Sequence, residues 1–289
     1  MKAIAFAPGH ISAFFEPIYN NSNIYRTGSR GAGINVSLGA ISKVTAKESA
    51  EQLFEFYING KKVNSPVVNL AFRHMLGETK IHTIVKTNLE LPIGQGFGMS
   101  SASALSATYA LAEILNCPKT DAMKASHFAE VQLKTGLGDV VASCFGGIEI
   151  RKEPGLPPWG IIEHIPGNYD VVLCVIGKEL GTKKILLDQS KLSGIMSYGK
   201  YCTKKLLEAP SIENLFLLSQ TFTEKTKLAN KKVLDAIKLV NNFGMASMCM
   251  LGNSVFAIGK TNDISTALLQ FGNVYICKVD ECGASLLKE

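Results

Sequence analysis

Hydrophobic and polar residues alternate over several short stretches of the first ninety residues, which is the period of a strand with one buried face. One stretch, residues 53–58, is followed by Asn59-Gly60 and by a second short run at 61–63. An Asn-Gly pair between two such runs predicts a β-hairpin with a type I′ turn. This part of the chain is therefore predicted to be mainly β. Its strands are predicted at 2–7, 34–47, 53–58, 61–63 and 81–89, and its one helix at 66–76.

After residue 100 the pattern changes to that of helices. Apolar side chains recur at three- and four-residue spacing over residues 102–116, which predicts a helix with one apolar face, and Pro118 ends it. Thr120 and Asp121 open a second predicted helix, which runs to about Lys134.

The rest of the chain mixes strands and helices. Pro and Gly are concentrated at 154–158, which makes this segment the best candidate for a boundary between two domains, 1–155 and 156–289. The order of elements beyond it suits a ferredoxin-like α+β domain. Strands are predicted there at 170–176, 246–250, 255–258 and 274–279, and helices at 191–207, 212–226, 231–242 and 263–270.

Composition is that of a globular protein. The chain has 289 residues, of which 46% are hydrophobic, enough for a full core and for two domains. No apolar run approaches the length of a membrane span, and the N-terminus has no secretory apolar region, so no membrane partner is predicted. Lys and Arg are scattered in ones and twos without interleaved aromatics, so no nucleic-acid partner is predicted. The net charge of +6 suits an anionic substrate.

The seven cysteines form no C-x-x-C pair and have no histidine at zinc spacing. Because their number is odd, reduced thiols inside a cell are favoured, and the protein is predicted to be cytoplasmic. Most of the cysteines lie in apolar runs, so they are interpreted as small core residues.

A glycine-rich turn joins the predicted strands to the central helix, over residues 91–103. Gly94, Gly96 and Gly98 carry no side chain that would keep backbone N–H groups away from a phosphate, and the N-terminus of the following helix favours an anion. Ser100 and Ser101 offer hydroxyls that cap the helix or bind a cation. The turn has neither the Gly-Lys-Ser/Thr ending of a P-loop nor the glycine spacing of the dinucleotide fingerprint. A tight packing turn is the alternative.

A second glycine-rich stretch, residues 27–39, is predicted to be a close-approach loop. Arg30 is its candidate anion-binding side chain, because a guanidinium matches a carboxylate bidentately. The alternative is a solvated arginine at a loop tip.

Two carboxylates follow the central helix. Glu130 lies near the end of the second helix, and Asp139 follows a short glycine loop at 135–138. Such a pair can divide its work: one carboxylate holds a Mg²⁺ ion, and the other orients an attacking hydroxyl and accepts its proton. The alternatives are that Glu130 is a solvated helix residue and that Asp139 is the N-cap of a helix over 140–145.

The turn at 91–103 resembles the phosphate-binding motif of the GHMP kinases, P-x-x-x-G-L-G-S-S-A-A. Met99 stands where the first serine of that motif is expected, and Ser100 takes the second. The resemblance implies ATP as the phosphate donor. It also implies that Ser100 and Glu130 bind Mg²⁺ and that Asp139 is catalytic. The implied ATP contacts are Pro92, Gly94, Gln95, Gly96, Phe97, Gly98, Met99, Ser100, Ser101 and Ala102.

Two further GHMP motifs are altered in this sequence. Pro8-Gly9 resembles the start of the first motif, but His10 replaces its usual lysine or arginine, and a histidine is a weaker, pH-dependent cation. The third motif is normally glycine-rich, whereas residues 250–254 contain only Gly252, which with Asn253 would approach the active site. The basic loop around Thr182 and Lys183 either closes over a phosphate or is solvated.

The resemblance implies an α+β fold of two domains, with a ribosomal protein S5 domain 2-like N-terminal domain and a ferredoxin-like C-terminal one. Residues 29–33 and 135–139, together with His10, point within the superfamily to the archaeal pantoate kinases. On that resemblance His10, Ser29 and Arg30 bind the small carboxylate substrate, which is phosphorylated on its primary hydroxyl for coenzyme A biosynthesis. A homodimer is possible in principle.

Two other functions stay open on the sequence. A mevalonate- or homoserine-type kinase would use the same ATP machinery with another acceptor pocket. A non-catalytic ATP-binding regulatory protein is the other alternative, although such a protein does not need the acceptor-facing carboxylate of Asp139.

Overall fold

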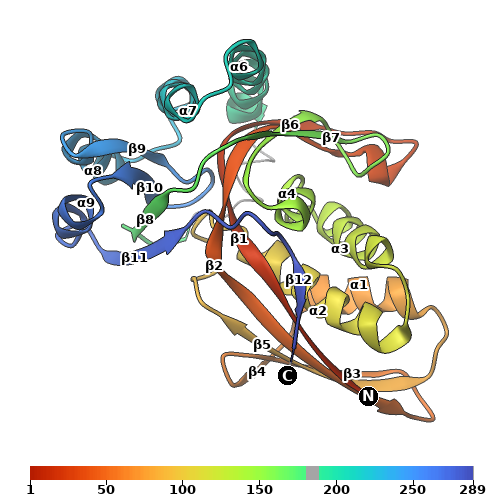
Figure 1. Cartoon of the computed structure of the whole chain (residues 1–289). Coiled ribbons are helices and arrows are strands. Elements are labelled where there is room, and N and C mark those ends of the chain that lie inside the picture. The colour runs from red at the N-terminus through yellow and green to blue at the C-terminus, as the bar shows by residue number, and fades with distance from the viewer. Residues whose placement is uncertain (180–188, 289) are drawn as a thin grey trace.

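The computed structural model describes residues 1–179 and 189–288. Within them the chain forms an eight-stranded sheet and a four-stranded sheet, each with helices packed on it (Figure 1). The predicted α+β class is confirmed. No helix of the described residues has both the length and the apolar composition needed to cross a membrane.

The first sheet is built around two long antiparallel strands, β1 (Lys2–Ile18) and β2 (Gly28–Glu48). The strand predicted at 2–7 ends too early: β1 continues through Pro8-Gly9, where its register with β2 shifts by a bulge. The other strands of this sheet are β3 (Leu53–Ile58), β4 (Lys61–Val63), β5 (Ile81–Leu89), β6 (Ile148–Glu153), β7 (Ile161–Ile165) and β12 (Ser285–Leu287).

The loop expected over residues 27–39 is also wrong, because most of this stretch is the start of β2, preceded by the short 3-10 helix Ile24–Arg26. Its glycines serve strand packing instead. A Cβ on Gly33 would lie 2.5 Å from His10 Nε2, and one on Gly31, whose φ is +147°, would lie 2.3 Å from the Phe14 carbonyl oxygen. Glycine therefore lets β1 and β2 approach closely without forming a loop.

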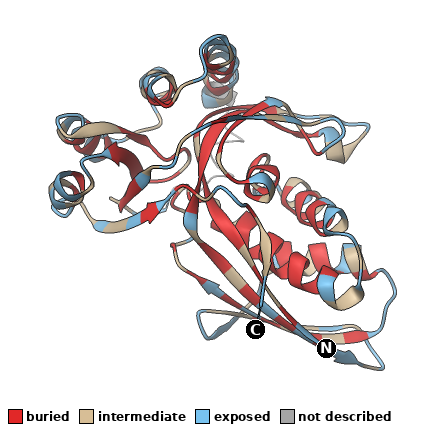
Figure 2. Cartoon of the chain, viewed as in Figure 1, coloured by how far each residue is buried: buried red, intermediate tan, exposed pale blue. Residues whose placement is uncertain are grey.

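Four helices cover one face of this sheet (Figure 1). The central one, α2 (Met99–Leu115), is buried on most of its surface (Figure 2) because its Ala and Ser side chains are small enough to let it lie against β1 and β2. The other three helices on this face are α1 (Pro66–Leu76), α3 (Lys119–Leu133) and α4 (Asp139–Phe145). The helices that periodicity predicted are confirmed.

The second sheet has the strand order β11-β8-β10-β9 and is antiparallel throughout. Its strands are β8 (Asp170–Val175), β9 (Gly244–Met248), β10 (Ser254–Gly259) and β11 (Asn273–Lys278). The helices α7 (Ile212–Thr226), α8 (Lys231–Val240) and α9 (Thr261–Leu268) pack on it. Helix α6 (Gln189–Glu208) packs instead against α7 and against β1 and β2 of the first sheet.

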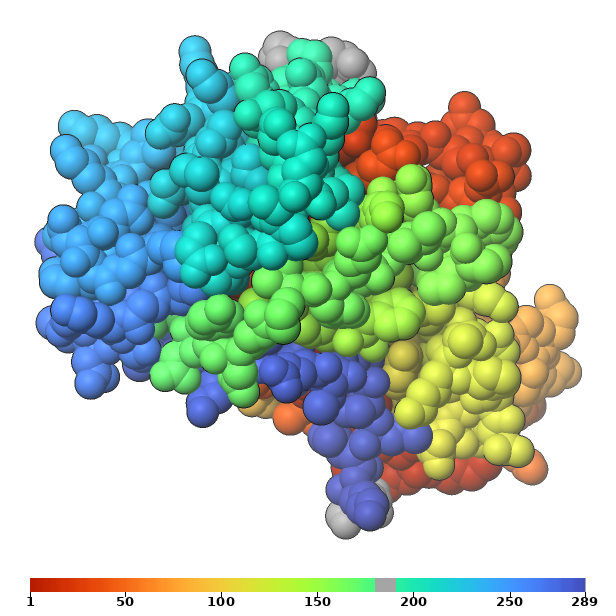
Figure 3. All heavy atoms as spheres, turned by 45° about the horizontal axis from the view of Figure 1, so that its top comes forward, coloured from red at the N-terminus to blue at the C-terminus, as the bar shows by residue number. Residues whose placement is uncertain are grey.

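Strands β7 and β12 have no counterpart in the sequence analysis. Both come after residue 155, and both pair with the first sheet. The last residues of the chain lie against its N-terminal half (Figure 3), where the Ala284 N–H donates to the Ser143 carbonyl. The division at 155/156 stays a prediction.

Candidate active site

A cavity of about 300 Å³ lies where the glycine-rich turn, the loop before α4 and the first turns of α2 and α4 meet the strands β1 and β2. Residues that are far apart in the sequence line it together. They are Ser12, Phe15, Ser29, Ile93, Gly94, Gly96, Phe97, Gly98, Met99, Ser100, Ser101, Lys134, Thr135, Gly136, Leu137, Gly138, Asp139, Met250 and Leu251.

The glycine-rich turn has the backbone geometry that an anion cradle needs. Gly94, Gly96 and Gly98 have φ angles of 76°, 76° and 62°, in the left-handed region that favours glycine. Gly98 caps α2 without any side-chain hydrogen bond, so the first N–H groups of this helix stay available to a ligand in the cavity. The predicted cradle thus lies at the N-terminus of a rigid, buried helix.

Seven of the ten predicted ATP contacts line the cavity, and Pro92, Gln95 and Ala102 do not. The Gln95 side chain instead donates to the Gly177 carbonyl at 3.0 Å. Gln95 thereby ties the turn to the loop that follows β8.

Ser100 and Glu130, the two predicted metal ligands, lie next to each other. The Ser100 hydroxyl donates to Glu130 Oε1 at 2.7 Å. The other carboxylate oxygen, Oε2, is buried and has no protein partner. Burial, with a smaller contribution from the negative charge of Asp139, raises the pKa of Glu130 to about 7. A divalent cation at these oxygens would satisfy the unpartnered oxygen and stabilise the ionised carboxylate, so the two side chains fit such an ion.

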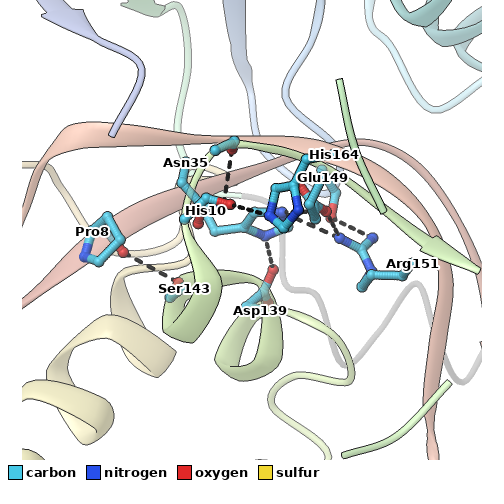
Figure 4. Close-up of polar contacts among 11 residues, drawn as sticks. Pro8, His10, Asn35, Asp139, Ser143, Glu149, Arg151 and His164 are labelled. Atoms are coloured by element: carbon cyan, nitrogen blue, oxygen red, sulfur yellow. Dashed lines mark hydrogen bonds and ion pairs between the residues drawn. The ribbon is translucent and has the colours of Figure 1, made fainter. Parts of the chain in front are cut away.

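Asp139 begins α4 and meets the side chain of His10 from β1 (Figure 4). His10 Nδ1 lies 2.6 Å from Asp139 Oδ1, and His10 Nε2 lies 3.1 Å from Glu149 Oε1. Arg151 donates through Nη1 to Glu149 Oε1, and this nitrogen is also 3.2 Å from His10 Nε2. Two predicted site residues thus form one network with two residues of β6.

This network shifts the pKa values of Asp139 and His10, the two predicted site residues in it. Burial alone would raise the pKa of Asp139, but the hydrogen bond from His10 and the positive charges of His10 and Arg151 outweigh it and lower the pKa. Burial would likewise lower the pKa of His10, yet the Glu149 and Asp139 carboxylates outweigh it and raise that pKa. Asp139 is therefore ionised at neutral pH.

Ser29 lies in the cavity beside the guanidinium of Arg151. A Cβ on Gly138 would lie 2.3 Å from Ser29 Oγ and 2.8 Å from Arg151 Nε, so a residue larger than glycine at 138 would displace both groups. Arg151 Nη2 reaches Ser12 Oγ at 3.5 Å, whereas its Nε is buried and has no partner. Arg151 itself is almost completely buried and is not among the described residues that line the cavity. An anion at this end of the cavity would therefore meet the Ser12 and Ser29 hydroxyls, with the unsatisfied N–H of Arg151 beside them.

Arg30 is not among the described residues that line this cavity. Its Nη2 donates to Glu153 Oε2 at 2.8 Å, and its Nη1 lies 4.0 Å from Glu16 Oε2. The cause is strand alternation, because neighbouring residues of a strand point to opposite faces of the sheet. Since Ser29 faces the cavity, Arg30 faces away from it.

The altered third motif packs against the glycine-rich turn. Met250 and Leu251 line the cavity, whereas Gly252 and Asn253 do not. A Cβ on Gly252 would lie 2.1 Å from the Gln95 carbonyl oxygen, so glycine permits this close contact. The Asn253 side chain donates to the Lys178 carbonyl at 2.6 Å and accepts from Asn230 at 2.8 Å. Thr182 and Lys183 lie outside the described residues.

Glu149 and Arg151 were missed by the sequence analysis. Both are almost completely buried, with 0% and 1% exposure. The available signal was a strand, soon after the motif at 135–139, in which charged residues occupy the alternate positions 149, 151 and 153 and Lys152 lies between two of them. Because charged side chains are rarely buried without partners, such alternation indicates a polar network.

Sequence comparison links this site to known kinases. Residues 63–147 match the model of the GHMP kinases N terminal domain. The chain is 36% identical to a pantoate kinase of Methanocaldococcus jannaschii, over 95% of this chain and 99% of that protein. It is 30% identical to a pantoate kinase of Thermococcus kodakarensis, over 91% of this chain and 89% of that protein.

Comparison with solved structures agrees with the sequence matches. A solved structure described as a phosphotransferase related to the CoA biosynthesis pathway superposes with a TM-score of 0.91 at 26% identity, covering 99% of this chain and 98% of that one. A homoserine kinase of Cytophaga hutchinsonii has the same fold, with a TM-score of 0.73 at 17% identity over 99% of this chain and 97% of that one. With the glycine-rich turn, the Ser100–Glu130 pair and Asp139 around one cavity, these matches show that the chain belongs to the GHMP kinase family.

Proposed function

We propose that the chain is a pantoate kinase, which transfers the γ-phosphoryl group of ATP to the primary hydroxyl of pantoate and forms 4-phosphopantoate for coenzyme A biosynthesis. The observation that carries the proposal is the convergence of an anion cradle, the Ser100–Glu130 pair and an ionised Asp139 on one cavity. The pantoate kinases that match nearly the full chain support the choice of acceptor.

The glycine-rich turn and the α2 N-terminus would hold the ATP phosphates through backbone N–H groups. Ser100 and Glu130 would hold Mg²⁺, which when bound supplies positive charge to the phosphate oxygens. Asp139 would accept a hydrogen bond from the acceptor hydroxyl and align its oxygen with the γ-phosphorus. As the new O–P bond forms and the bond to the β-phosphate oxygen breaks, Asp139 would take the hydroxyl proton. ADP and the phosphorylated acid are the products.

The carboxylate of pantoate would bind at the Ser12, Ser29 and Arg151 end of the cavity. Arg151 offers a buried Nε–H without a partner, and Ser29 lies beside it. An incoming carboxylate would satisfy this donor in a charge-assisted hydrogen bond. Both arginines already have a carboxylate partner, Glu153 for Arg30 and Glu149 for Arg151, and both have a buried Nε without a hydrogen-bond partner. Arg151, however, lies beside Ser12, Ser29 and Gly138, which line the cavity. The structure therefore supports Arg151 in that role better than Arg30.

The reaction is tested by measuring ADP release from ATP and Mg²⁺ with pantoate, mevalonate, homoserine and no acceptor in parallel. We expect release that depends on pantoate and produces one 4-phosphopantoate for each ADP. Turnover with mevalonate or homoserine would keep the ATP site but reject the proposed acceptor. ATP binding without turnover on any acceptor would favour the regulatory function instead.

The carboxylate-binding residues are separated by comparing Ser29→Ala and Arg151→Lys with Arg30→Ala. Loss of a hydrogen bond to a charged group costs about 1.5 to 3 kcal/mol. We therefore expect Ser29→Ala and Arg151→Lys to lower kcat/KM for pantoate by about 10-fold or more, while the KM for ATP stays unchanged. Arg30→Ala, whose side chain faces away from the cavity, should stay within about 3-fold of wild type.

If Arg30→Ala instead lowered kcat/KM for pantoate the most, the pantoate carboxylate would be assigned to Arg30 and not to Arg151. Arg151→Lys keeps the positive charge next to Glu149, so its folding can be checked by thermal unfolding beside the kinetics. A homodimer and a cytoplasmic location stay predictions from the sequence.

A further inference from the structure

His10 has a carboxylate oxygen facing each of its two ring nitrogens (Figure 4). Asp139 Oδ1 lies 2.6 Å from Nδ1, and Glu149 Oε1 lies 3.1 Å from Nε2. A neutral imidazole has one N–H and can donate to only one of them, whereas an imidazolium donates to both. The two carboxylate oxygens therefore match the doubly protonated form, whereas a neutral Nε2 would match only Arg151 Nη1, which lies 3.2 Å from it.

The charges of the network lead to the same result. The side chains of His10, Glu149 and Arg151 are 0%, 0% and 1% exposed, and that of Asp139 is 27% exposed. Two carboxylates and one guanidinium leave one negative charge without compensation, and an unpaired buried charge is strongly unfavourable. A positive charge on His10 brings the four groups to neutrality.

The elements around His10 differ in the charge that they present to it. Helix α4 presents Asp139, and β6 presents Glu149 and Arg151. From β2, which pairs with β1 beside His10, comes the uncharged Asn35. The glycine-rich turn contributes the Phe97 carbonyl, which accepts from the His10 backbone N–H.

A further titratable group near this network is Glu130 of α3, which interacts electrostatically with Asp139. Arg151 opposes protonation of His10, but its Nη1 donates to the same oxygen of Glu149 that faces the ring. Glu149 is thus the group that offsets Arg151 at Nε2.

We propose that Glu149 is a positioning residue of the kinase, which holds His10 in its doubly protonated form so that a fixed cation flanks Asp139. Glu149 does not line the cavity and acts only through His10. In this way a histidine supplies, at neutral pH, the positive charge that a lysine or arginine supplies by itself. The raised pKa of His10, to which Glu149 contributes the largest favourable effect against the cost of burial, agrees with this role. The inference rests on the proposed kinase function for its kinetic test only.

The first test needs neither activity nor a variant of Glu149. The ring nitrogens of the wild-type protein are followed by ¹⁵N NMR from pH 6 to pH 9, with His10→Gln used to assign the His10 signals among the five histidines. We expect both His10 nitrogens to stay protonated through pH 7.5, above the ordinary titration of histidine. A neutral ring at pH 7.5 would overturn the proposal even in an active enzyme.

The second test is the pH profile of kcat/KM for the acceptor in Glu149→Gln. Removing the negative charge lowers the pKa of His10, so the decline of activity at alkaline pH should begin about 1 to 3 pH units lower than in wild type. The deficit relative to wild type should grow by about 10-fold for each unit of that shift and should shrink again toward acid pH, as His10 becomes protonated in both proteins. Glu130 is present in both the wild-type protein and Glu149→Gln, so its titration cancels in the ratio of their kcat/KM values.

Glu163→Gln on the neighbouring strand β7 is the matched control. Its carboxylate is exposed and pairs with Lys152, so both the profile and the rate should be those of wild type. If Glu149→Gln lowers kcat/KM by the same factor at every pH, Glu149 has a structural role only, and the proposal is wrong. An enzyme inactive on every acceptor rejects the proposed function, and the NMR titration then still decides the state of His10.

Discussion

Asp139→Asn is expected to lower kcat for pantoate by about 10²- to 10⁴-fold, the range for loss of a general acid–base group. The asparagine keeps the shape of the side chain but can neither take the proton of the acceptor hydroxyl nor carry the negative charge that faces His10. Because the proposed phosphate-binding groups are in the turn at 94–98 and at the N-terminus of α2, ATP binding should be retained. Steady-state ADP release and ATP binding by calorimetry measure the two effects separately.

The matched control is Asp121→Asn, which removes an exposed carboxylate of α3 whose partner is Lys124 at 3.6 Å. An exposed pair of this kind contributes little, so turnover and thermal stability should be unchanged. Near-normal turnover of Asp139→Asn would show that Asp139 is not the acceptor-facing group, and the catalytic assignment would then be abandoned.

Glu130→Gln is expected to have the second large effect, on the response to Mg²⁺. The amide removes the negative charge from the one carboxylate that lies against Ser100, and with it most of the attraction for a hard cation. We expect kcat/KM for ATP to fall by about 10²-fold or more at a fixed Mg²⁺ concentration, because an electrostatic stabiliser of the transferred phosphoryl group is lost. Part of this loss should be recovered as the Mg²⁺ concentration is raised.

A Mg²⁺ titration of ADP release at saturating pantoate makes the measurement, with Glu113→Gln on the exposed side of α2 as the control. Ser100→Ala should shift the titration in the same direction but by less, because it removes a neutral ligand. If Glu130→Gln has the Mg²⁺ dependence of wild type, Glu130 is a buried structural acid whose raised pKa serves no cation.

Most elements of the fold follow from local pattern. The hairpin at 53–63 was predicted from Asn59-Gly60, and the structure gives these residues φ angles of 48° and 79°, as the turn requires. Strands β7 and β12 were missed for a physical reason. β7 has little apolar alternation and β12 has three residues, so neither is stable alone, and each forms only by pairing with a strand that is distant in the sequence.

In the candidate site, too, some features were predicted from the sequence and others depend on the fold. The glycine-rich turn, Ser100, Glu130 and Asp139 were found from the sequence, because a phosphate cradle and its cation ligands need particular residue types at short spacing. The structure then brings Ser100 to Glu130 and His10 to Asp139. The two members of these pairs are 30 and 129 residues apart in the sequence, so no local pattern predicts that they meet.

The local sequence around Arg30 and Arg151 does not indicate in which direction their side chains point. The sequence by itself determined where a glycine-rich turn, a carboxylate pair and a glycine-flanked arginine lie, and it predicted from them a phosphate cradle and an acidic substrate, because these predictions depend on residue types and short spacings. Only the tertiary structure showed that Arg151 lies beside Ser29 at the cavity, whereas Arg30 faces away from it. A side chain's direction depends on whether its segment is a loop or a strand and on the strand's register, so Gly28–Glu48 as a strand turns Arg30 outward. Pairing of β2 with β6 brings Arg151 and Glu149 to His10, and long-range strand pairing of this kind leaves no trace in the local pattern.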